Sequence, residues 1–218
     1  IKHFLYASTS SVYGLDKKFP LSEEFGSSHP IQLYAATKRA NELFAHAYSS
    51  LYNLPTTGLR FFTVYGPWGR PDMALFKFTK NILEGKKITL FNRGDHIRDF
   101  TYVDDIVHGI VELLKKPPKE NKKLLYKKIL KNNQSPFKFR IVNIGGNKPI
   151  KLSKYVSCIE KELNKKSKKT LLPLQPGDIY KTHANSLNLK KIIKRNNVTK
   201  VEEGIKNFIN WYKEYYKK

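Results

Sequence analysis

The chain has 218 residues, of which 40% are hydrophobic; this suits one domain or one and a half with a packed core, and excludes collagen-like, low-complexity and largely disordered classes. No stretch approaches the ~18 to 20 consecutive apolar residues that a membrane span requires, and no charged-then-apolar leader is seen, so we expect a soluble, cytoplasmic protein without a membrane partner. The formal charge is +23, and Cys158 is the single cysteine, which excludes an intrachain disulfide and leads us to expect no metal.

Predicted strands and helices alternate through the first 145 residues. The strands are predicted at His3–Ser8, Thr57–Phe62, Ile88–Phe91, Phe100–Val103 and Arg140–Ile144. The helices between them are predicted at Tyr34–Leu51, Ala74–Leu83 and Ile106–Leu114, and three more follow at Leu152–Leu163, Leu187–Ile193 and Val201–Tyr216. Such alternation favours βαβ crossovers and a parallel sheet.

The excess of basic residues lies in the second half of the chain. Residues 115–218 hold 28 Lys and Arg against 7 Asp and Glu, whereas residues 1–114 hold 13 against 11. Residues 115–138 are the most polar stretch, and Pro117 and Pro118 block a helix there, so we predict an exposed, partly flexible insertion. Clustered lysines can bind nucleic acid or an anionic surface. The ratio of 34 Lys to 7 Arg instead favours solvated surface positions, because Arg is the side chain suited to phosphate and base recognition.

Tyr34 and Lys38 are four residues apart at the start of the first long helix, so they lie on one face within reach of each other. A neighbouring ammonium favours tyrosinate, and a desolvated Lys with a cationic cofactor ring could supply the roughly three pKa units, or about 4 kcal/mol, that make a phenol a general base near neutral pH. Tyr13 and Lys17 have the same spacing, so the alternative of a plain surface pair stays open for such a motif taken alone.

Longer motifs occur in order along the chain: YAATKRANELFAHAYS, LRFFTVYGPWGRPDMALFKFTK, RDFTYVDDI, VNIGG, LPLQPGDI and GIKNFINWYKEYY. With them, the chain resembles the extended short-chain dehydrogenase/reductase (NAD-dependent epimerase/dehydratase) family, closest to its UDP-glucuronate 4-epimerases, everywhere except the Lys-rich insertion. The resemblance implies an α/β fold: the C-terminal part of a Rossmann-like parallel sheet with a smaller, mainly helical substrate-binding domain. We expect residues 1–70 in the former and 71–218 mostly in the latter, with residues around 100–115 returning to the sheet.

The resemblance also implies the chemistry. In this family NAD takes hydride from C4 of a UDP-sugar, the 4-keto sugar rotates, and hydride returns to the opposite face. Tyr34 would remove the hydroxyl proton, Lys38 would hold the nicotinamide ribose and lower the pKa of Tyr34, and Thr9 would bind the C4 oxygen and relay its proton. Ser8 and Phe61 would join Tyr34 and Lys38 at the cofactor. The alternative for residues 9–11 is a Ser/Thr turn that satisfies its own backbone.

Substrate choice follows from a difference within the family. Relatives that dehydrate or decarboxylate the keto sugar carry a carboxylate in the tract occupied here by Thr9, Ser10 and Ser11. Ser10, Ser11, Thr63 and Arg70 are expected to cradle the C6 carboxylate of a uronic acid, with Arg70 as the charged partner unless it is only a surface arginine. We therefore expect conversion of UDP-glucuronate to UDP-galacturonate. Another nucleotide-sugar epimerase, such as UDP-glucose 4-epimerase, and a non-catalytic basic scaffold are the alternatives.

The remaining motifs would hold the nucleotide. By likeness, backbone at Ala74 and Leu75 and the side chain of Arg98 would meet the diphosphate, Phe91 would pack near the uracil, and Asp178 would reach the ribose. The alternative for Arg98 is an ion pair with a nearby carboxylate, namely Asp99, Asp104 or Asp105. Asp104 and Asp105 are themselves expected at a helix N-terminus.

Two further expectations concern what surrounds these motifs. The Gly-x-x-Gly-x-x-Gly phosphate turn of NAD-binding folds is absent, since Gly66 and Gly69 form only a lone Gly-x-x-Gly; we expect a C-terminal fragment that is inactive alone, with an uncovered edge on its first strand. The helices at 34–51 and 74–83 are expected to form a homodimer interface. Its candidate contacts, which could instead fill the monomer core, are Phe44, Tyr48, Phe76 and Phe78.

Overall fold

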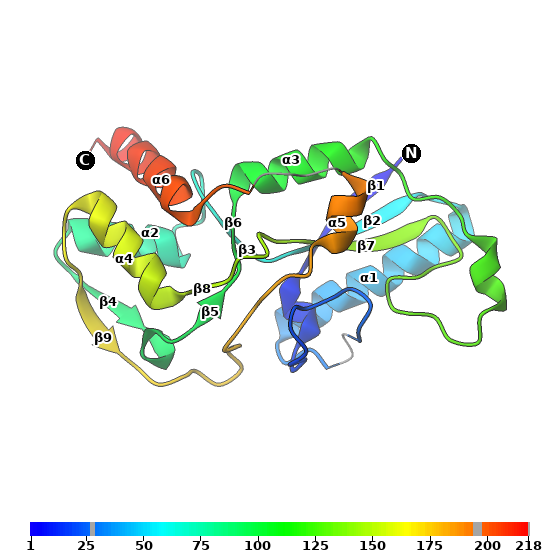
Figure 1. Cartoon of the computed structure of the whole chain (residues 1–218), viewed down its shortest axis with the longest axis horizontal. Helices are drawn as coiled ribbons and strands as arrows, with labels where there is room; N and C mark the ends of the chain where they lie inside the picture. Colours follow the sequence, from blue (N-terminus) through cyan, green and yellow to red (C-terminus); the bar gives the residue numbers. More distant parts are fainter. Residues whose placement is uncertain (27–28, 194–197, 218) are drawn as a thin grey trace.

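Figure 1 shows the computed structural model, which describes residues 1–26, 29–193 and 198–217. A three-stranded parallel sheet has the order β1 (Phe4–Thr9), β2 (Thr56–Phe61), β7 (Phe139–Ile144). Phe4 pairs with Thr56, and Thr56 pairs with Phe139, so the three strands start and end together. The predicted parallel sheet is confirmed, and its carboxyl edge lies at residues 9, 61 and 144.

Helices cover both faces of this sheet. Helix α1 (Leu33–Tyr52) packs on one face, whereas α3 (Val103–Leu114) and α5 (Leu187–Ile192) lie on the other (Figure 1). Successive side chains of a strand point to opposite faces. In β2, Leu59 accordingly joins the apolar cluster beneath α3, while its neighbour Arg60 reaches Glu42 of α1. Every residue of β2 but the last is buried, as expected of a central strand covered on both sides.

The other end of the molecule is built on three packed helices, α2 (Ala74–Leu83), α4 (Leu152–Leu163) and α6 (Val201–Tyr216). Their core is rich in aromatic rings: Tyr155 stacks on Phe100 with ring centroids 3.9 Å apart, and Phe76 contacts Phe208 and Tyr212. Such rings bury large apolar areas, so they stabilise a small helical layer effectively.

Short strand pairs connect the two ends. β3 (Thr63–Tyr65) pairs with β6 (Phe100–Tyr102) in parallel, β4 (Lys87–Leu90) with β9 (Lys168–Leu171) in parallel, and β5 (Ile97–Arg98) with β8 (Ile150–Lys151) antiparallel. Three 3-10 turns also form: η1 (Ser10–Tyr13), η2 (Phe91–Gly94) and η3 (Lys122–Tyr126). Strands β3, β5, β8 and β9 were not predicted; runs this short carry little periodicity, although the equally short β4 and β6 were predicted.

The exposed surfaces agree only in part with expectation. Phe76 and Phe78 are buried in the helical core, so of the proposed dimer contacts only Phe44 and Tyr48 are exposed. β1 has one strand neighbour in the described part of the chain, and Phe4 on it is 42% exposed. None of the described helices combines the length and hydropathy that a membrane crossing requires.

Candidate active site

Two adjoining cavities lie where the sheet meets the helical end. The first, of about 700 Å³, opens at the carboxyl edge of β1 and β2, and the second, of about 610 Å³, lies between α2, η2 and β5. Thr63, Ala74 and Phe100 line both. The first is lined by every residue predicted for the sugar and the cofactor except Lys38, namely Ser8, Thr9, Ser10, Ser11, Tyr34, Phe61, Thr63 and Arg70. Ala74 and Leu75, which were predicted for the diphosphate, line it as well. The second is lined by Phe91, Arg98 and Asp178.

Tyr34 lies in the first turn of α1, beside the end of β1. Its side chain is 53% exposed, and Lys38 Nζ lies 6.0 Å from the centre of its ring. Lys38 Nζ also donates a hydrogen bond of 3.1 Å to the carbonyl oxygen of Ala7. The helix therefore presents a phenol into the cavity and an ammonium against the strand that lines it.

Thr9 ends β1 and caps η1. Its Oγ1 accepts a hydrogen bond from the backbone N–H of Ser11 at 3.2 Å and donates one to Ser11 Oγ at 3.3 Å. The Ser/Thr turn considered from sequence is therefore present, and the same hydroxyls line the cavity. The Ser8 hydroxyl is different, because it donates to buried Glu42 at 2.6 Å.

The second Tyr-x-x-x-Lys pair has a different environment. Tyr13 is buried, its hydroxyl donates to Asn143 Oδ1 at 2.7 Å, and Arg60 lies 4.7 Å from the centre of its ring. Burial raises the pKa of Tyr13 to about 12, with the charge of Arg60 opposing the shift. Tyr13 is thus a structural residue. Of the two Tyr-x-x-x-Lys tyrosines, Tyr34 is the one that lines the cavity.

Arg70 lies in the loop after β3 at the mouth of the first cavity. It forms a bidentate ion pair with Asp72, with Nε–Oδ1 3.0 Å and Nη2–Oδ2 2.5 Å. The Arg70 side chain is 73% exposed, and an exposed pair of this kind contributes little to stability. Its guanidinium can therefore exchange Asp72 for another carboxylate at small cost.

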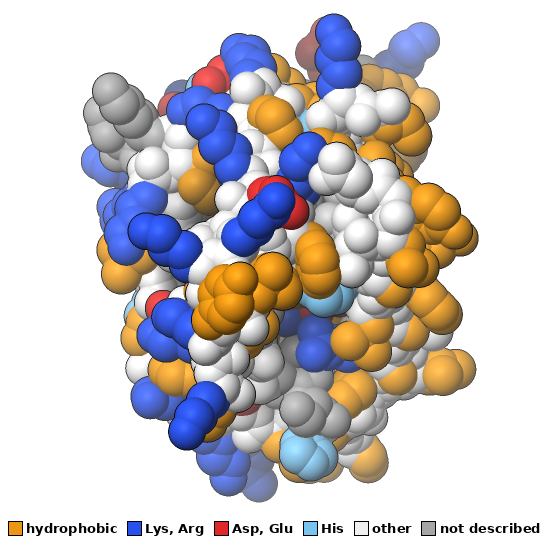
Figure 2. Space-filling view, turned by 90° about the vertical axis from the view of Figure 1, so that its right-hand side faces the viewer, with side chains coloured by type: hydrophobic (Ala, Val, Ile, Leu, Met, Phe, Trp, Pro, Cys, Tyr) orange, Lys and Arg blue, Asp and Glu red, His pale blue; other side chains and the backbone are white. Residues whose placement is uncertain are grey.

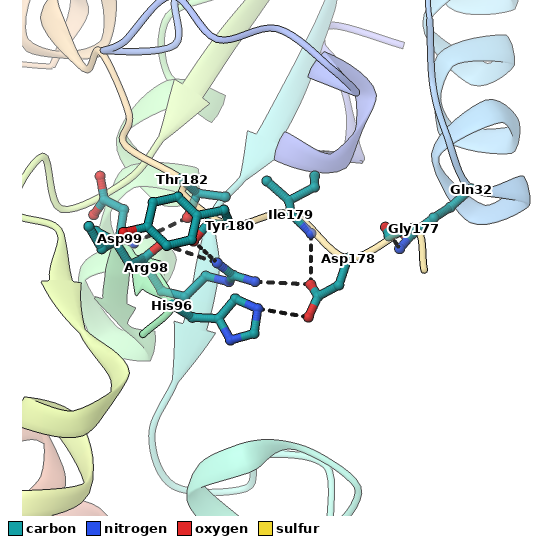
Figure 3. A network of polar contacts seen from close by, with 10 residues as sticks. Gln32, His96, Arg98, Asp99, Gly177, Asp178, Ile179, Tyr180 and Thr182 are labelled. Carbon is teal, nitrogen blue, oxygen red and sulfur yellow. Dashed lines mark hydrogen bonds and ion pairs between the residues drawn. The ribbon is translucent and has the colours of Figure 1, made fainter. Parts of the chain in front are cut away.

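Arg98 and Asp178 are brought together in the second cavity (Figure 3). Arg98 Nη2 lies 3.0 Å from Asp178 Oδ1, which also accepts the backbone N–H of Ile179 at 2.8 Å. His96 Nε2 lies 2.9 Å from the other carboxylate oxygen. The carboxylate that pairs with Arg98 is therefore none of the nearby ones considered as alternatives, because it lies 80 residues further along the chain.

The carboxylates near Arg98 have structural partners of their own. Buried Asp99 accepts hydrogen bonds from the backbone N–H groups of Gly146, Asn147 and Ala184 at 2.8 to 3.0 Å. Burial raises the pKa of Asp99 and these hydrogen bonds oppose the shift. Asp104 and Asp105 lie in the first turn of α3, as predicted, and Asp105 also accepts the backbone N–H of Thr199 at 2.9 Å.

Comparison with known proteins identifies the family. The family model described as "NAD dependent epimerase/dehydratase family" matches residues 1–127. The chain belongs to this family.

Relatives in the family are similar over nearly all of the chain. It is 51% identical to Protein CapI of Staphylococcus aureus over 219 residues, covering 100% of this chain and 65% of CapI. It is 43% identical to the probable UDP-glucuronate 4-epimerase of Rhizobium meliloti, covering 100% of this chain and 64% of that protein. The crystal structure of UDP-glucuronic acid 4-epimerase from Bacillus cereus with UDP-glucuronic acid and NAD superposes with a TM-score of 0.82 at 31% identity, covering 98% of this chain and 62% of that one. The chain thus spans a little under two thirds of the length of these relatives.

Sequence reasoning missed three residues, of which His96 lines the second cavity and Gln32 and Glu42 contact residues or segments beside the cavities. His96 completes the contacts of Asp178, and Gln32 Nε2 donates to the carbonyl of Gly177 at 2.9 Å, which joins the start of α1 to the segment carrying Asp178 (Figure 3). The Glu42 carboxylate accepts the hydrogen bond of the Ser8 hydroxyl, which lines the first cavity. The position of Gln32, two residues before Tyr34, was a signal for it in the sequence, whereas Glu42 lies inside a predicted helix and His96 between two predicted strands without any distinguishing pattern.

Proposed function

We propose that this chain provides the catalytic and nucleotide-sugar-binding part of an NAD-dependent UDP-glucuronate 4-epimerase, which interconverts UDP-glucuronate and UDP-galacturonate. The observation that carries the proposal is the first cavity, where Tyr34, Thr9 and Arg70 converge at the carboxyl edge of a parallel sheet. The names of the R. meliloti relative, a probable UDP-glucuronate 4-epimerase, and of the B. cereus UDP-glucuronic acid 4-epimerase support the same reaction.

Tyr34 is the general base of this proposal. Its phenolic oxygen takes the proton of the C4 hydroxyl, and Thr9 Oγ1 hydrogen-bonds the same oxygen and relays the proton. The ammonium of Lys38, 6.0 Å from the Tyr34 ring centre, stabilises the tyrosinate that accepts this proton, and the tyrosine is a neutral phenol after the transfer.

The residues present fit the nicotinamide end of NAD. The wall formed by residues 7–9 and Phe61 is apolar at Ala7 and Phe61, and Lys38 already donates to the carbonyl of Ala7 at this wall. NAD bound there would supply the hydride acceptor for C4 of the sugar and the donor that restores the hydride on the other face. No Gly-x-x-Gly-x-x-Gly turn is present in the sequence, so we propose that the 218-residue chain binds NAD weakly and is inactive by itself.

Arg70 confers the preference for a uronic acid. Its guanidinium releases Asp72 and forms a bidentate pair with the C6 carboxylate, while Ser10, Ser11 and Thr63 add hydroxyl contacts from the same cavity wall. Residues 9–11 contain no carboxylate that would repel the negative charge of the substrate.

The second cavity takes the nucleotide. Arg98 contributes its charge to the diphosphate, Asp178 accepts a ribose hydroxyl, and Phe91 packs on the uracil; all three line this space. Ala74 and Leu75 lie in the first turn of α2. The backbone N–H groups of a first helical turn have no partner within the helix and can donate hydrogen bonds to an anion such as a phosphate.

We also propose a cytoplasmic homodimer formed through α1 and α2. The support comes from α1, on which Leu43, Phe44, Tyr48, Leu51 and Tyr52 are all more than half exposed. On α2 the expected contacts Phe76 and Phe78 are buried, as are Leu75, Thr79 and Ile82, so the exposed Lys77 and Lys80 are the residues available to a partner.

The test joins this chain to the amino-terminal part of CapI and compares turnover of UDP-glucuronate with that of UDP-glucose. We expect preference for the acid, and we expect Arg70→Ala to lower turnover of the acid about tenfold or more while leaving the neutral sugar unchanged. Arg93→Ala, which changes an exposed arginine outside both cavities, is the matched control. Preference for UDP-glucose, or equal effects of the two variants, would contradict the uronate site.

A calorimetric titration of the 218-residue chain with NAD tests the other half of the proposal. Weak or undetectable binding is expected, and tight binding would show that the chain holds the cofactor without the glycine turn.

A further inference from the structure

Residues 119–131, the basic loop, expose large apolar side chains among lysines. Its sequence, KENKKLLYKKILK, holds six Lys and one Glu. Four apolar side chains in it are exposed: Leu125 by 57%, Tyr126 by 88%, Ile129 by 86% and Leu130 by 40%. Single exposed apolar residues are common on proteins, but four within six positions form a patch that calls for a partner.

The fold holds this patch outward. Leu124, within η3, is buried, and Asn121 N–H donates to the carbonyl of Pro136 at 2.9 Å, so one end of the basic loop is attached to the body. At the other end Lys131 Nζ pairs with Glu24 at 2.7 Å. Between these attachments the chain turns Tyr126 and Ile129 to solvent.

The charge of the basic loop selects an anionic partner. Lys131 is paired with Glu24, and Lys122 lies 3.8 Å from Glu120, the loop's own acidic residue. Lys123, Lys127 and Lys128 are exposed and adjoin the apolar residues in sequence. Figure 2, which views this end of the molecule, shows lysine side chains interspersed with hydrophobic ones.

The apolar residues distinguish between anionic partners. Phosphates of a nucleic acid would be met by the lysines alone, and most of the exposed area of Leu125 and Ile129 would gain nothing. At a lipid surface, apolar and aromatic tips enter the boundary between headgroups and acyl chains while lysines meet anionic headgroups. We propose that the basic loop is a peripheral attachment site for an anionic lipid surface.

This site is separate from the proposed enzyme function. The basic loop contributes no residue to either cavity. Figure 1 places it at the end of the sheet opposite α2, α4 and α6, so attachment there leaves the cavities open. Peripheral attachment requires no membrane-crossing helix, in agreement with the described helices.

The experiment is flotation of the chain with vesicles of phosphatidylcholine alone or mixed with phosphatidylglycerol. We expect binding to the mixed vesicles that weakens with salt. Lys127→Gln/Lys128→Gln should lower the partition roughly tenfold or more, and Tyr126→Ser/Ile129→Ser should lower it by a similar factor at unchanged charge. Lys161→Gln/Lys206→Gln, which removes two exposed lysines from α4 and α6, is the control and should lose much less.

A second measurement locates the contact. In Tyr126→Trp, the added emission should shift to the blue and be quenched by brominated acyl chains on mixed vesicles only. Equal binding to neutral vesicles, an effect of the control as large as that of the loop lysines, or no effect of Tyr126→Ser/Ile129→Ser would each overturn the proposal. Preferential, salt-sensitive binding to duplex DNA with no vesicle binding would assign the lysines to nucleic acid instead.

Discussion

Glu42 and Arg60 form a buried bidentate ion pair beneath the first cavity. Arg60 Nε lies 2.8 Å from Oε1 and Nη2 lies 2.8 Å from Oε2. Ser8 Oγ donates to the same Oε1 at 2.6 Å, and Arg39 Nη1 donates to Oε2 at 2.8 Å. Burial raises the pKa of Glu42, but these hydrogen bonds, those of Arg60 first, outweigh it and leave the pKa lowered. One carboxylate thus joins the helix that carries Tyr34 to the strand that ends at Thr9.

Glu42→Gln should destabilise the fold strongly. The change removes the carboxylate charge that pairs with the buried guanidinium of Arg60, for which we expect a loss of about 3–5 kcal/mol in the free energy of unfolding. Urea unfolding measures it. Arg39→Gln, which removes a partner that is 23% exposed, should lose less than about 1 kcal/mol. Similar losses for the two variants would show that the buried pair is not the main attachment.

The same helix shows where the sequence was informative and where it was not. The 3.6-residue spacing of Leu43, Phe44 and Tyr48 predicted α1 correctly, yet these residues are exposed, and the residues it buries include Ala35, Glu42 and Ser49. Periodicity identifies a helix because it reflects the helical repeat. It does not say which face meets the sheet when a buried ion pair supplies the contact.

Tyr34→Phe should lower epimerisation strongly without weakening the fold. The side chain is half exposed, so removing its hydroxyl leaves packing unchanged. Loss of a general base lowers turnover by about 10²–10⁴-fold. Turnover in the CapI fusion and thermal unfolding of the same variant measure the two effects.

Tyr13→Phe is the matched control, because Tyr13 belongs to the other Tyr-x-x-x-Lys pair. It should destabilise the fold by about 1–3 kcal/mol, since Asn143 Oδ1 loses a buried donor. Turnover per folded molecule should stay near the parent value. A variant pair with the two effects exchanged would assign the base to Tyr13.

Arg98→Met should weaken binding of UDP to the chain. We expect roughly a tenfold loss or more, because a charge-assisted contact to the diphosphate disappears. Calorimetric titration with UDP measures it. Arg93→Met removes an arginine five positions away that lines neither cavity and should leave the affinity unchanged. Equal losses would mean that general charge, not the second cavity, attracts UDP.

The second cavity was predictable only through the resemblance. Arg98 and Asp178 lie 80 residues apart, and neither charge pattern nor periodicity reports a contact across that separation. The position of residues 9–11 beside Thr63 was easier, because parallel strands end at one edge of the sheet. The sequence therefore indicated the sugar side from topology, while the contact of His96 with Asp178 required the fold.

Glu160→Gln should make stability less dependent on acid pH. Glu160 is 6% exposed and accepts hydrogen bonds from the backbone and hydroxyl of Ser167, and Lys169 Nζ lies 3.0 Å away. Burial raises its pKa, but the hydrogen bonds from Ser167 and the contact with Lys169 outweigh it and lower the pKa to about 2. The unfolded chain titrates near its usual value of about 4.3.

The sign of the effect follows from that depression. A carboxylate whose pKa is lower in the folded state contributes stability that is fully present above about pH 5 and is lost as the pH falls toward about 2. Glu160→Gln should therefore unfold more easily than the parent by about 2–3 kcal/mol at neutral pH, and the difference should shrink as acid is added. Urea unfolding at a series of pH values measures it, with Glu162→Gln on the same helix as control. A difference that stays constant down to about pH 2 would show that the charge of Glu160 is not what joins α4 to β9.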